Sequence, residues 1–491
     1  MHELRIDAAM NSKNTQINNG VLYVVELAIT TLLPVLVLRV FTRILTSGDY
    51  GLWALAQVYA VFVTGFCNVG LLTAFERNFF EDKTPEGRQK LFCTIWLFVA
   101  GCMVLGAGVT FIFSGTLSQW IIREPGHGTL LLTTFCSTCI ISLNQYGLMW
   151  LKNTEQAKSY LHLGVAEKVT AIAVSLLLVA GFRIGVQGLV LGQLAGAGLL
   201  FFLLGARLFR NPIFDRDVLF HSLRIGFPLT PRIFLGVINS QFDKYMIGLM
   251  NTIGGVGIYS IGQMLANGVF LFMTAIQNVF APQVYRRMFE LGAEGSGEIG
   301  RYLTPFIYIS VGVALLVAFF AEEVIMILMP PSYHSAANIV MIMACYYALL
   351  FFSKQPQLIY AKKTHISSLL GIASVVLNVG LNIPLIRAFG AIGAAWATLL
   401  SGLFSGALIF IVSQKYYHIG WQYRRITAMY LILGLGVLAL FIPAATYPMR
   451  IFIKCTGLVL YGFLGHRIGI LTKEHILLVR DQLFRKNFQK A

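Results

Sequence analysis

Apolar residues along this chain occur in runs of about 20, and short polar or charged stretches separate the runs. A run of that length crosses about 30 Å of hydrocarbon as an α-helix, whereas a membrane β-barrel alternates apolar and polar residues in strands of about 10. The pattern therefore predicts an all-α polytopic membrane protein with about fourteen transmembrane helices. The predicted spans are 19–40, 50–73, 91–114, 128–150, 161–181, 185–206, 225–249, 255–280, 302–320, 336–360, 365–386, 390–412, 426–446 and 448–468.

Composition excludes a water-soluble globular enzyme. Of the 491 residues, 57% are hydrophobic and 12% are charged, compared with about 45–50% and about 25% in soluble domains. Mean hydropathy is +0.73. The connections between the predicted spans are short, so no folded catalytic domain fits outside the bilayer.

The charges predict the orientation in the membrane. The chain has 37 Lys+Arg against 21 Asp+Glu, and most of these cations fall in alternate loops on one side. By the positive-inside rule, this asymmetry places both termini in the cytoplasm. It also explains the basic charge without nucleic acid as a partner. Residues 1–18 are polar and lack a signal-peptide pattern, and residues 469–491 resemble an amphipathic surface helix.

Short matches indicate an internal repeat. Gly51–Gln57 opens the second span, and Gly257–Gln263 opens the eighth span 206 residues later. Gly185–Gly188 and Gly390–Gly393 open the sixth and twelfth spans, 205 residues apart. Six spans per unit is an even number, so the two units share one orientation, which defines a parallel repeat. The alternative explanation is a convergent use of glycine at span starts.

The repeat predicts two six-helix lobes with a cleft between them, which suits alternating access. The expected organisation is a cytoplasmic N-terminal tail (1–18), a first lobe (19–210), a cytoplasmic linker (211–224), a second lobe (225–412), two further spans with their preceding loop (413–468) and a cytoplasmic amphipathic tail (469–491).

The seventh span is the richest in polar side chains. At about 100° per residue, Pro228, Arg232, Asn239 and Asp243 share one face, and Lys244 follows directly. A charge at the bilayer centre costs from about 3 to more than 10 kcal/mol, so these charges are candidate functional groups. The prolines at the start of this span are expected to bend it.

Polar stripes follow three further spans. They comprise Asn19, Tyr23, Glu26 and Thr30 in the first span, Gln57, Thr64 and Asn68 in the second, and Gln263, Asn267, Thr274 and Asn278 in the eighth. We expect these stripes and the seventh span to face one hydrophilic cleft. Structural alternatives remain open. Arg232 forms a buried ion pair with Glu26 or Asp243, Asp243 and Lys244 form a helix-end pair that fixes packing, or the amides hold helices together. Lys168 and Lys454 lie near span ends, where a long side chain can reach the interface.

No residue pattern indicates an enzyme. The sequence has no phosphate-binding glycine loop, and neither a catalytic set nor a metal-ligand set can be assembled from its spacing. We therefore expect no catalytic residue, no metal and no cofactor. The seven cysteines lie within predicted spans, which argues against a disulfide framework.

Two motifs resemble a known family. Ser47-Gly-Asp-Tyr-Gly-Leu-Trp53 is similar to a segment that follows the first span of polysaccharide transporters, and Phe242-Asp-Lys-Tyr-Met-Ile-Gly248 resembles their seventh span. This family is the O-antigen and lipid-linked oligosaccharide flippase branch of the multidrug/oligosaccharidyl-lipid/polysaccharide (MOP) exporter superfamily.

The resemblance implies a flippase in the bacterial inner (cytoplasmic) membrane. By alternating access, it would move an undecaprenyl-diphosphate-linked oligosaccharide from the cytoplasmic to the periplasmic face. Arg232 and Lys244 would bind the diphosphate. The amides of Asn239, Gln57, Gln263 and Asn267 would bind sugars, with Asn68 as a further polar group of the cleft, and Glu26 and Asp243 would balance charge or carry a proton. Expected partners are the glycan lipid, membrane lipids and other membrane proteins of polysaccharide assembly. The alternatives are a cation-coupled drug exporter of the same superfamily, a membrane glycan polymerase or ligase, and a lipid scaffold without transport activity.

Overall fold

The computed structural model describes residues 2–81, 84–209, 213–353, 356–442 and 446–470, and all regular structure in these ranges is helical. The long helices are α1 (His2–Ile44), α2 (Ser47–Asn68), α4 (Pro85–Ile112), α6 (Gly128–Asn153), α7 (Ala157–Leu176), α8 (Val186–Leu208), α10 (Thr230–Met250), α11 (Ile253–Leu291), α12 (Ser296–Phe319), α14 (Ala336–Ser353), α16 (Thr364–Tyr416), α17 (Tyr423–Leu440) and α18 (Tyr447–Arg467). Shorter helices are α3 (Leu71–Asn78), α5 (Ser114–Ile121), α9 (Arg216–Gly226), α13 (Ala321–Leu328) and α15 (Gln357–Tyr360), with short turns η1 (Leu177–Gly181), η2 (Phe227–Leu229), η3 (Gly292–Gly295) and η4 (Pro331–Tyr333).

The predicted spans coincide with these helices, so the expectation of an all-α polytopic membrane protein is confirmed. Nine stretches of the described residues are long and apolar enough to cross a membrane. One stretch holds both α11 and α12, and another holds the two halves of α16, which is interrupted at Gly390. Three more predicted spans match α6, α10 and α18, whose polar residues keep them out of those nine.

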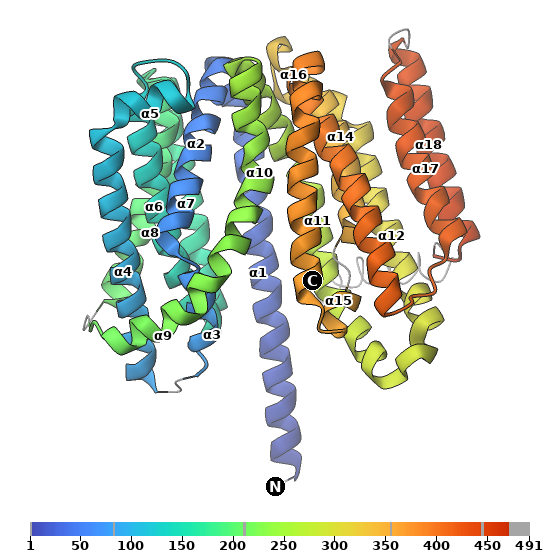
Figure 1. Cartoon of the computed structure of the whole chain (residues 1–491), viewed down its shortest axis with the longest axis horizontal. Helices are drawn as coiled ribbons and strands as arrows, with labels where there is room; N and C mark the ends of the chain where they lie inside the picture. The colour runs from blue at the N-terminus through green and yellow to red at the C-terminus, as the bar shows by residue number, and fades with distance from the viewer. Residues whose placement is uncertain (1, 82–83, 210–212, 354–355, 443–445, 471–491) are drawn as a thin grey trace, which may run out of the picture. The chain divides into compact units, whose positions relative to one another are not determined.

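The chain packs into two compact units. Unit 1 comprises Met1–Ser260, Ile327–Tyr333 and Ile386–Ala391, and unit 2 comprises Ile261–Met326, His334–Leu385 and Ile392–Ala491. In unit 1, α6 packs between α2 and α8, and α7 packs on α8 and α1 (Figure 1). The lobe boundary expected at 211–224 stays a prediction. The expected amphipathic tail falls, from residue 471 onward, outside the described residues.

Aromatic side chains fill the core of unit 1. Phe75, Phe135 and Tyr146 are fully buried, and the rings of Phe75 and Tyr146 meet edge to face with centroids 5.7 Å apart. In unit 2, the rings of Tyr308 on α12 and Tyr461 on α18 stack at 4.6 Å. Each of these two hydroxyls donates to the other residue's carbonyl oxygen, at 3.1 and 2.5 Å. These bonds satisfy polar groups inside the bilayer and fix α18 on α12.

Unit 1 also contains two short surface helices that the apolar runs did not predict. Their contact is so close that a Cβ on Gly70, at the start of α3, would lie 2.2 Å from the carbonyl oxygen of Gly226 at the end of α9. Asp215 caps α9, because its carboxylate accepts the backbone N–H of Asp217 at 2.8 Å. Lys90 of α4 lies 2.5 Å from the same carboxylate. The hydrogen bond from Lys90 and the helix cap hold the pKa of Asp215 below its ordinary value.

The backbone agrees with the predicted repeat. Gly185 has φ 67° and ψ −147° at the start of α8, and Gly390 has φ 59° and ψ −137° at the start of the second half of α16. These are nearly the same conformation, one that L-residues rarely adopt. The shared sequence Gly-x-x-Gly therefore adopts the same backbone turn in both repeats.

Candidate functional site

The beginnings of α2 and α11 cross within unit 1, and glycines make the crossing possible. A Cβ on Gly51 would lie 1.9 Å from the carbonyl oxygen of Ile253, and a Cβ on Gly257 would lie 2.0 Å from the carbonyl oxygen of Ser47. Both partners are separated by the repeat offset of 206, so the two contacts are reciprocal copies of each other. We call this contact the glycine crossing; a local two-fold axis relates its two sides.

Further contacts hold the helix ends together at the glycine crossing. The Tyr333 hydroxyl of η4 donates to the carbonyl oxygen of Leu45 at 2.6 Å, and the Tyr333 ring meets that of Tyr50 edge to face at 6.0 Å. Thr46 and Asp49 form a reciprocal capping box at the start of α2. This end of unit 1 is therefore tightly closed.

The seventh predicted span breaks where its prolines lie. α9 ends at Gly226, the turn η2 follows, and α10 begins at Thr230, which confirms the expected bend. Along α10, Phe234 packs on Phe66 of α2 with ring centroids 3.8 Å apart. The seventh span thus lies along the second span, and the hydrophilic cleft expected from their polar stripes stays a prediction.

Asp243 and Lys244 of α10 each have a hydrogen-bond partner, and they also interact electrostatically with each other. Asp243 is buried and accepts a hydrogen bond from the Tyr259 hydroxyl of α11 at 2.8 Å. The Lys244 ammonium donates to the side-chain oxygen of Gln241 at 3.1 Å. Asn239 is exposed. Arg232 belongs to α10 by its backbone, and its side chain lies outside the described part of the structure.

The polar stripe of α1 contacts α7 and the loop that precedes it. Asn19 donates to the carbonyl oxygen of Glu155 at 3.3 Å, the rings of Tyr23 and Tyr160 meet at 5.1 Å, and a Cβ on Gly164 would lie 2.7 Å from a Glu26 carboxylate oxygen.

Glu26 meets a charged pair on α7 that the sequence analysis did not select. Glu167 is buried, and the Lys168 ammonium lies 3.3 Å from its carboxylate. Both residues interact electrostatically with Glu26. Lys168 is thus part of an ion pair rather than a lone cation reaching for the interface. The adjacent residues Glu167 and Lys168 inside a predicted span were the sequence feature that could have identified the pair.

The predicted amides differ in their surroundings. Asn68 donates to Ser142 at 2.7 Å and accepts from the Tyr146 hydroxyl at 2.7 Å, so it joins α2 to α6. Gln57 makes longer contacts, at 3.5 Å, with Gln193 and Thr138. In unit 2, Gln263 and Asn267 are half-buried on α11.

Lys454 does not reach for the membrane interface, which corrects the expectation from its position near a span end. Its side chain is 4% exposed, and its ammonium lies 2.5 Å from Glu323 and 3.6 Å from Glu322 of α13. Arg450 binds Glu322 at 2.9 Å. Two cations and two carboxylates therefore join α13 to α18. Across the described residues, no group of three or more His, Cys, Asp or Glu could hold a metal ion.

Solved structures with this fold are membrane transporters. The chain is similar to the lipid II flippase MurJ in an inward closed conformation, with a TM-score of 0.70 and 15% identity over 92% of this chain and 99% of that chain. It is also similar to an inward-facing multidrug resistance MATE family transporter (TM-score 0.64, 14% identity, 83% and 98% of the two chains) and to a MOP superfamily transporter from Pyrococcus furiosus (TM-score 0.57, 14% identity, 85% and 96%). The protein therefore has the fold of the MOP superfamily transporters.

The sequence adds the family. Residues 40–338 match the family model described as polysaccharide biosynthesis protein. Because the match covers more than half of the chain, this protein belongs to that family. A comparison with curated proteins gave no significant match.

Proposed function

We propose that this protein is a flippase that moves an undecaprenyl-diphosphate-linked oligosaccharide, such as an O-antigen unit, from the cytoplasmic to the periplasmic face of the bacterial inner membrane. One observation carries the proposal: a member of a polysaccharide biosynthesis family has the fold of a MOP transporter. Biosynthesis of a surface glycan needs a step in which the lipid-linked unit crosses the membrane. A transporter fold supplies that step, and the protein acts as a transporter rather than an enzyme.

The two parts of the substrate, its polar head group and its polyprenyl tail, need different surroundings. The diphosphate and sugars cannot enter hydrocarbon, while the polyprenyl tail can remain there. Arg232 and Lys244 bind the diphosphate, the exposed Asn239 binds sugar hydroxyls, and Glu26 and Asp243 balance charge. Outward movement of about two negative charges is favoured by a negative-inside potential, at about 2.3 kcal/mol per charge per 100 mV.

The glycine crossing supplies the gate of an alternating-access cycle. The topology predicted from Lys and Arg places the beginnings of α2 and α11 on the periplasmic side. Tight contact there closes the periplasmic exit, and separation of the two helix ends opens it. The reciprocal geometry means that one movement breaks both contacts.

The test replaces both proposed diphosphate ligands. Arg232→Ala with Lys244→Ala should lower surface glycan strongly and accumulate the lipid-linked unit in the cell. Lys363→Ala with Arg387→Ala removes two exposed cations outside the proposed site and is the matched control. Normal surface glycan in cells that hold the folded Arg232/Lys244 variant would remove these residues from the mechanism.

A cation-coupled drug exporter is the second candidate, favoured by the acidic group of Glu26 and Glu167 inside the membrane. The two functions are separated with purified protein in vesicles. A flippase moves a fluorescent undecaprenyl-diphosphate glycan, whereas an exporter moves a cationic dye when a proton or sodium gradient is applied.

A further inference from the structure

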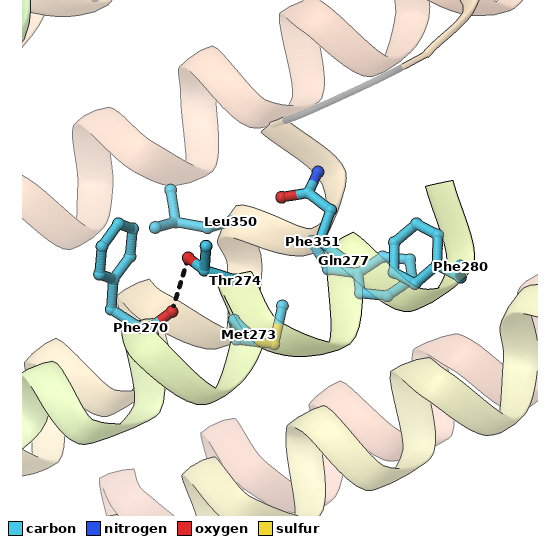
Figure 2. Close-up of a pocket in the computed structure, with 7 residues that line it drawn as sticks. All are labelled: Phe270, Met273, Thr274, Gln277, Phe280, Leu350 and Phe351. Atoms are coloured by element: carbon cyan, nitrogen blue, oxygen red, sulfur yellow. Dashed lines mark hydrogen bonds between the residues drawn. The ribbon is translucent and has the colours of Figure 1, made fainter. Parts of the chain in front are cut away.

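A pocket lies between α11 and α14 in unit 2, and of its lining residues the sequence analysis placed only Thr274 in a polar stripe. The pocket is a partly open recess, and about 260 Å³ of space lies in it when its open side is included. Its lining residues are Phe270, Met273, Thr274, Gln277, Phe280, Leu350 and Phe351 (Figure 2).

Flat rings stand at both ends of this pocket. Figure 2 shows Phe270 at one end and Phe280 at the other. The Phe280 ring packs against Phe351 with centroids 5.1 Å apart, and Phe270 packs against Tyr347 at 5.6 Å. None of the lining residues is charged, so the pocket does not suit the diphosphate.

Two polar side chains lie between the rings. The Thr274 hydroxyl donates to the carbonyl oxygen of Phe270 at 2.9 Å and can still accept a hydrogen bond. Gln277 is half-buried and has no hydrogen-bond partner among the residues that the structure describes. At about 100° per residue, both lie on the same face of α11 as Gln263 and Asn267. The pocket therefore continues the polar stripe that we proposed for sugar binding.

The repeat shows what is unusual about this pocket. An offset of 206 relates Thr274 to Asn68, and an offset of 205 relates Phe351 to Tyr146. In unit 1, the Tyr146 hydroxyl donates to Asn68 and closes the equivalent position. In unit 2, the phenyl ring has no hydroxyl and the shorter threonine leaves space. At the position of Gln277, unit 1 has Leu71, which is fully buried. In place of the hydrogen-bonded pair of unit 1, unit 2 thus has open space and an amide without a partner among the described residues.

We propose that this pocket binds one neutral sugar ring of the transported glycan lipid. The proposal rests on the function proposed above. A sugar ring presents C–H groups to the negative faces of the phenyl rings, and its hydroxyls pair with both ends of the Gln277 amide. A polyprenyl tail suits the pocket less well, because covering an unpaired amide with hydrocarbon costs about 2–7 kcal/mol.

Photolabelling tests the assignment without depending on transport. One probe carries a diazirine on the sugar of undecaprenyl-diphosphate N-acetylglucosamine, and the other carries it on the polyprenyl chain. With full-length protein in vesicles, the sugar probe should label residues 270–280 and 347–351. Gln277→Leu should reduce that labelling about tenfold, because it keeps the side-chain volume and removes the hydrogen bonds. Labelling of these segments by the chain probe alone would assign the pocket to the lipid tail and overturn the proposal.

A transport comparison adds a second readout. Phe270→Leu keeps an apolar side chain and removes the flat face, so it should slow flipping of the sugar-bearing lipid about tenfold and leave flipping of undecaprenyl diphosphate unchanged. Gln283→Leu makes the same amide-to-leucine change as Gln277→Leu at an exposed position outside the pocket on α11, and it should behave as wild type in both assays. Equal effects of Phe270→Leu on both lipids would overturn the pocket assignment. Wild-type protein that flips neither lipid, yet is labelled by the sugar probe, would overturn the proposed function and retain the pocket.

Discussion

Replacing Gly51 by alanine should force the glycine crossing apart. The added Cβ would lie 1.9 Å from the Ile253 carbonyl oxygen, where real Cβ atoms essentially never approach below 3.0 Å. The helix ends must therefore separate by about 1 Å, since backbone atoms on both sides cannot rotate away. Overpacking of this kind costs about 1–3 kcal/mol. A state in which α2 and α11 are already apart does not bear that cost.

The equilibrium between closed and open states should therefore shift by about 5–150-fold toward the open state. A reporter cysteine at Val256, which is fully buried near the crossing, measures the shift. In a background without the seven native cysteines, a membrane-impermeant maleimide added outside should label Val256→Cys faster by that factor in the Gly51→Ala variant.

The matched control is Gly65→Ala on the same helix, where an added Cβ meets nothing within 4 Å. It should leave the labelling rate unchanged. If folded Gly51→Ala protein labels Val256→Cys no faster than the control does, the crossing is not a gate, and the reasoning from backbone contact fails.

Three further predictions concern stability. Lys454→Met leaves Glu323 without its cation, while Glu322 keeps Arg450, and should lower the free energy of unfolding by about 3–5 kcal/mol. Thermal unfolding in detergent checks this against exposed Lys363→Met, and equal melting temperatures would contradict it. The pKa of Asp215 is lower in the folded than in the unfolded state. Its ion pair with Lys90 therefore stabilises the fold above about pH 4, and this stabilisation is lost as pH falls through the folded-state pKa. Asp215→Asn should remove this pH-dependent contribution to the free energy of unfolding, which is measured by following unfolding at a series of pH values. Gly185→Ala and Gly390→Ala place a side chain in a glycine-only backbone region and should each cost about 1–3 kcal/mol; Gly371→Ala, in open space inside a helix, should cost nothing by the same measurement.

The spans were predictable because the bilayer leaves few alternatives. Every backbone polar group in hydrocarbon needs an internal partner, so a 20-residue apolar run has one stable form, the helix. The proline break before α10 followed from the same logic. By contrast, α3 and α9 are short and amphipathic, and their docking depends on the contact between Gly70 and Gly226, which lie far apart in sequence.

The pattern of polar residues predicted which face of a helix is polar, but it did not predict which residues of other helices that face contacts. Asn68 shares a stripe with Gln57, yet the Tyr146 hydroxyl makes it a link between α2 and α6. Lys454 lies at a span end, and its partner Glu323 is 131 residues away. Glu26 meets Glu167 and Lys168 only because α1 packs on α7. Such pairings arise from tertiary packing, which no single helical period encodes.

The symmetry of the glycine crossing makes one more outcome calculable. Gly257→Ala meets the Ser47 carbonyl oxygen at 2.0 Å, nearly the same clash as Gly51→Ala. A single separation of α2 from α11 relieves both clashes, so the double variant should shift the gate little further than either single variant does. Independent sites would instead add their free energies. A double variant whose effect on Val256→Cys labelling equals the product of the two single effects would show that the contacts open separately, and that the repeat does not move as one element.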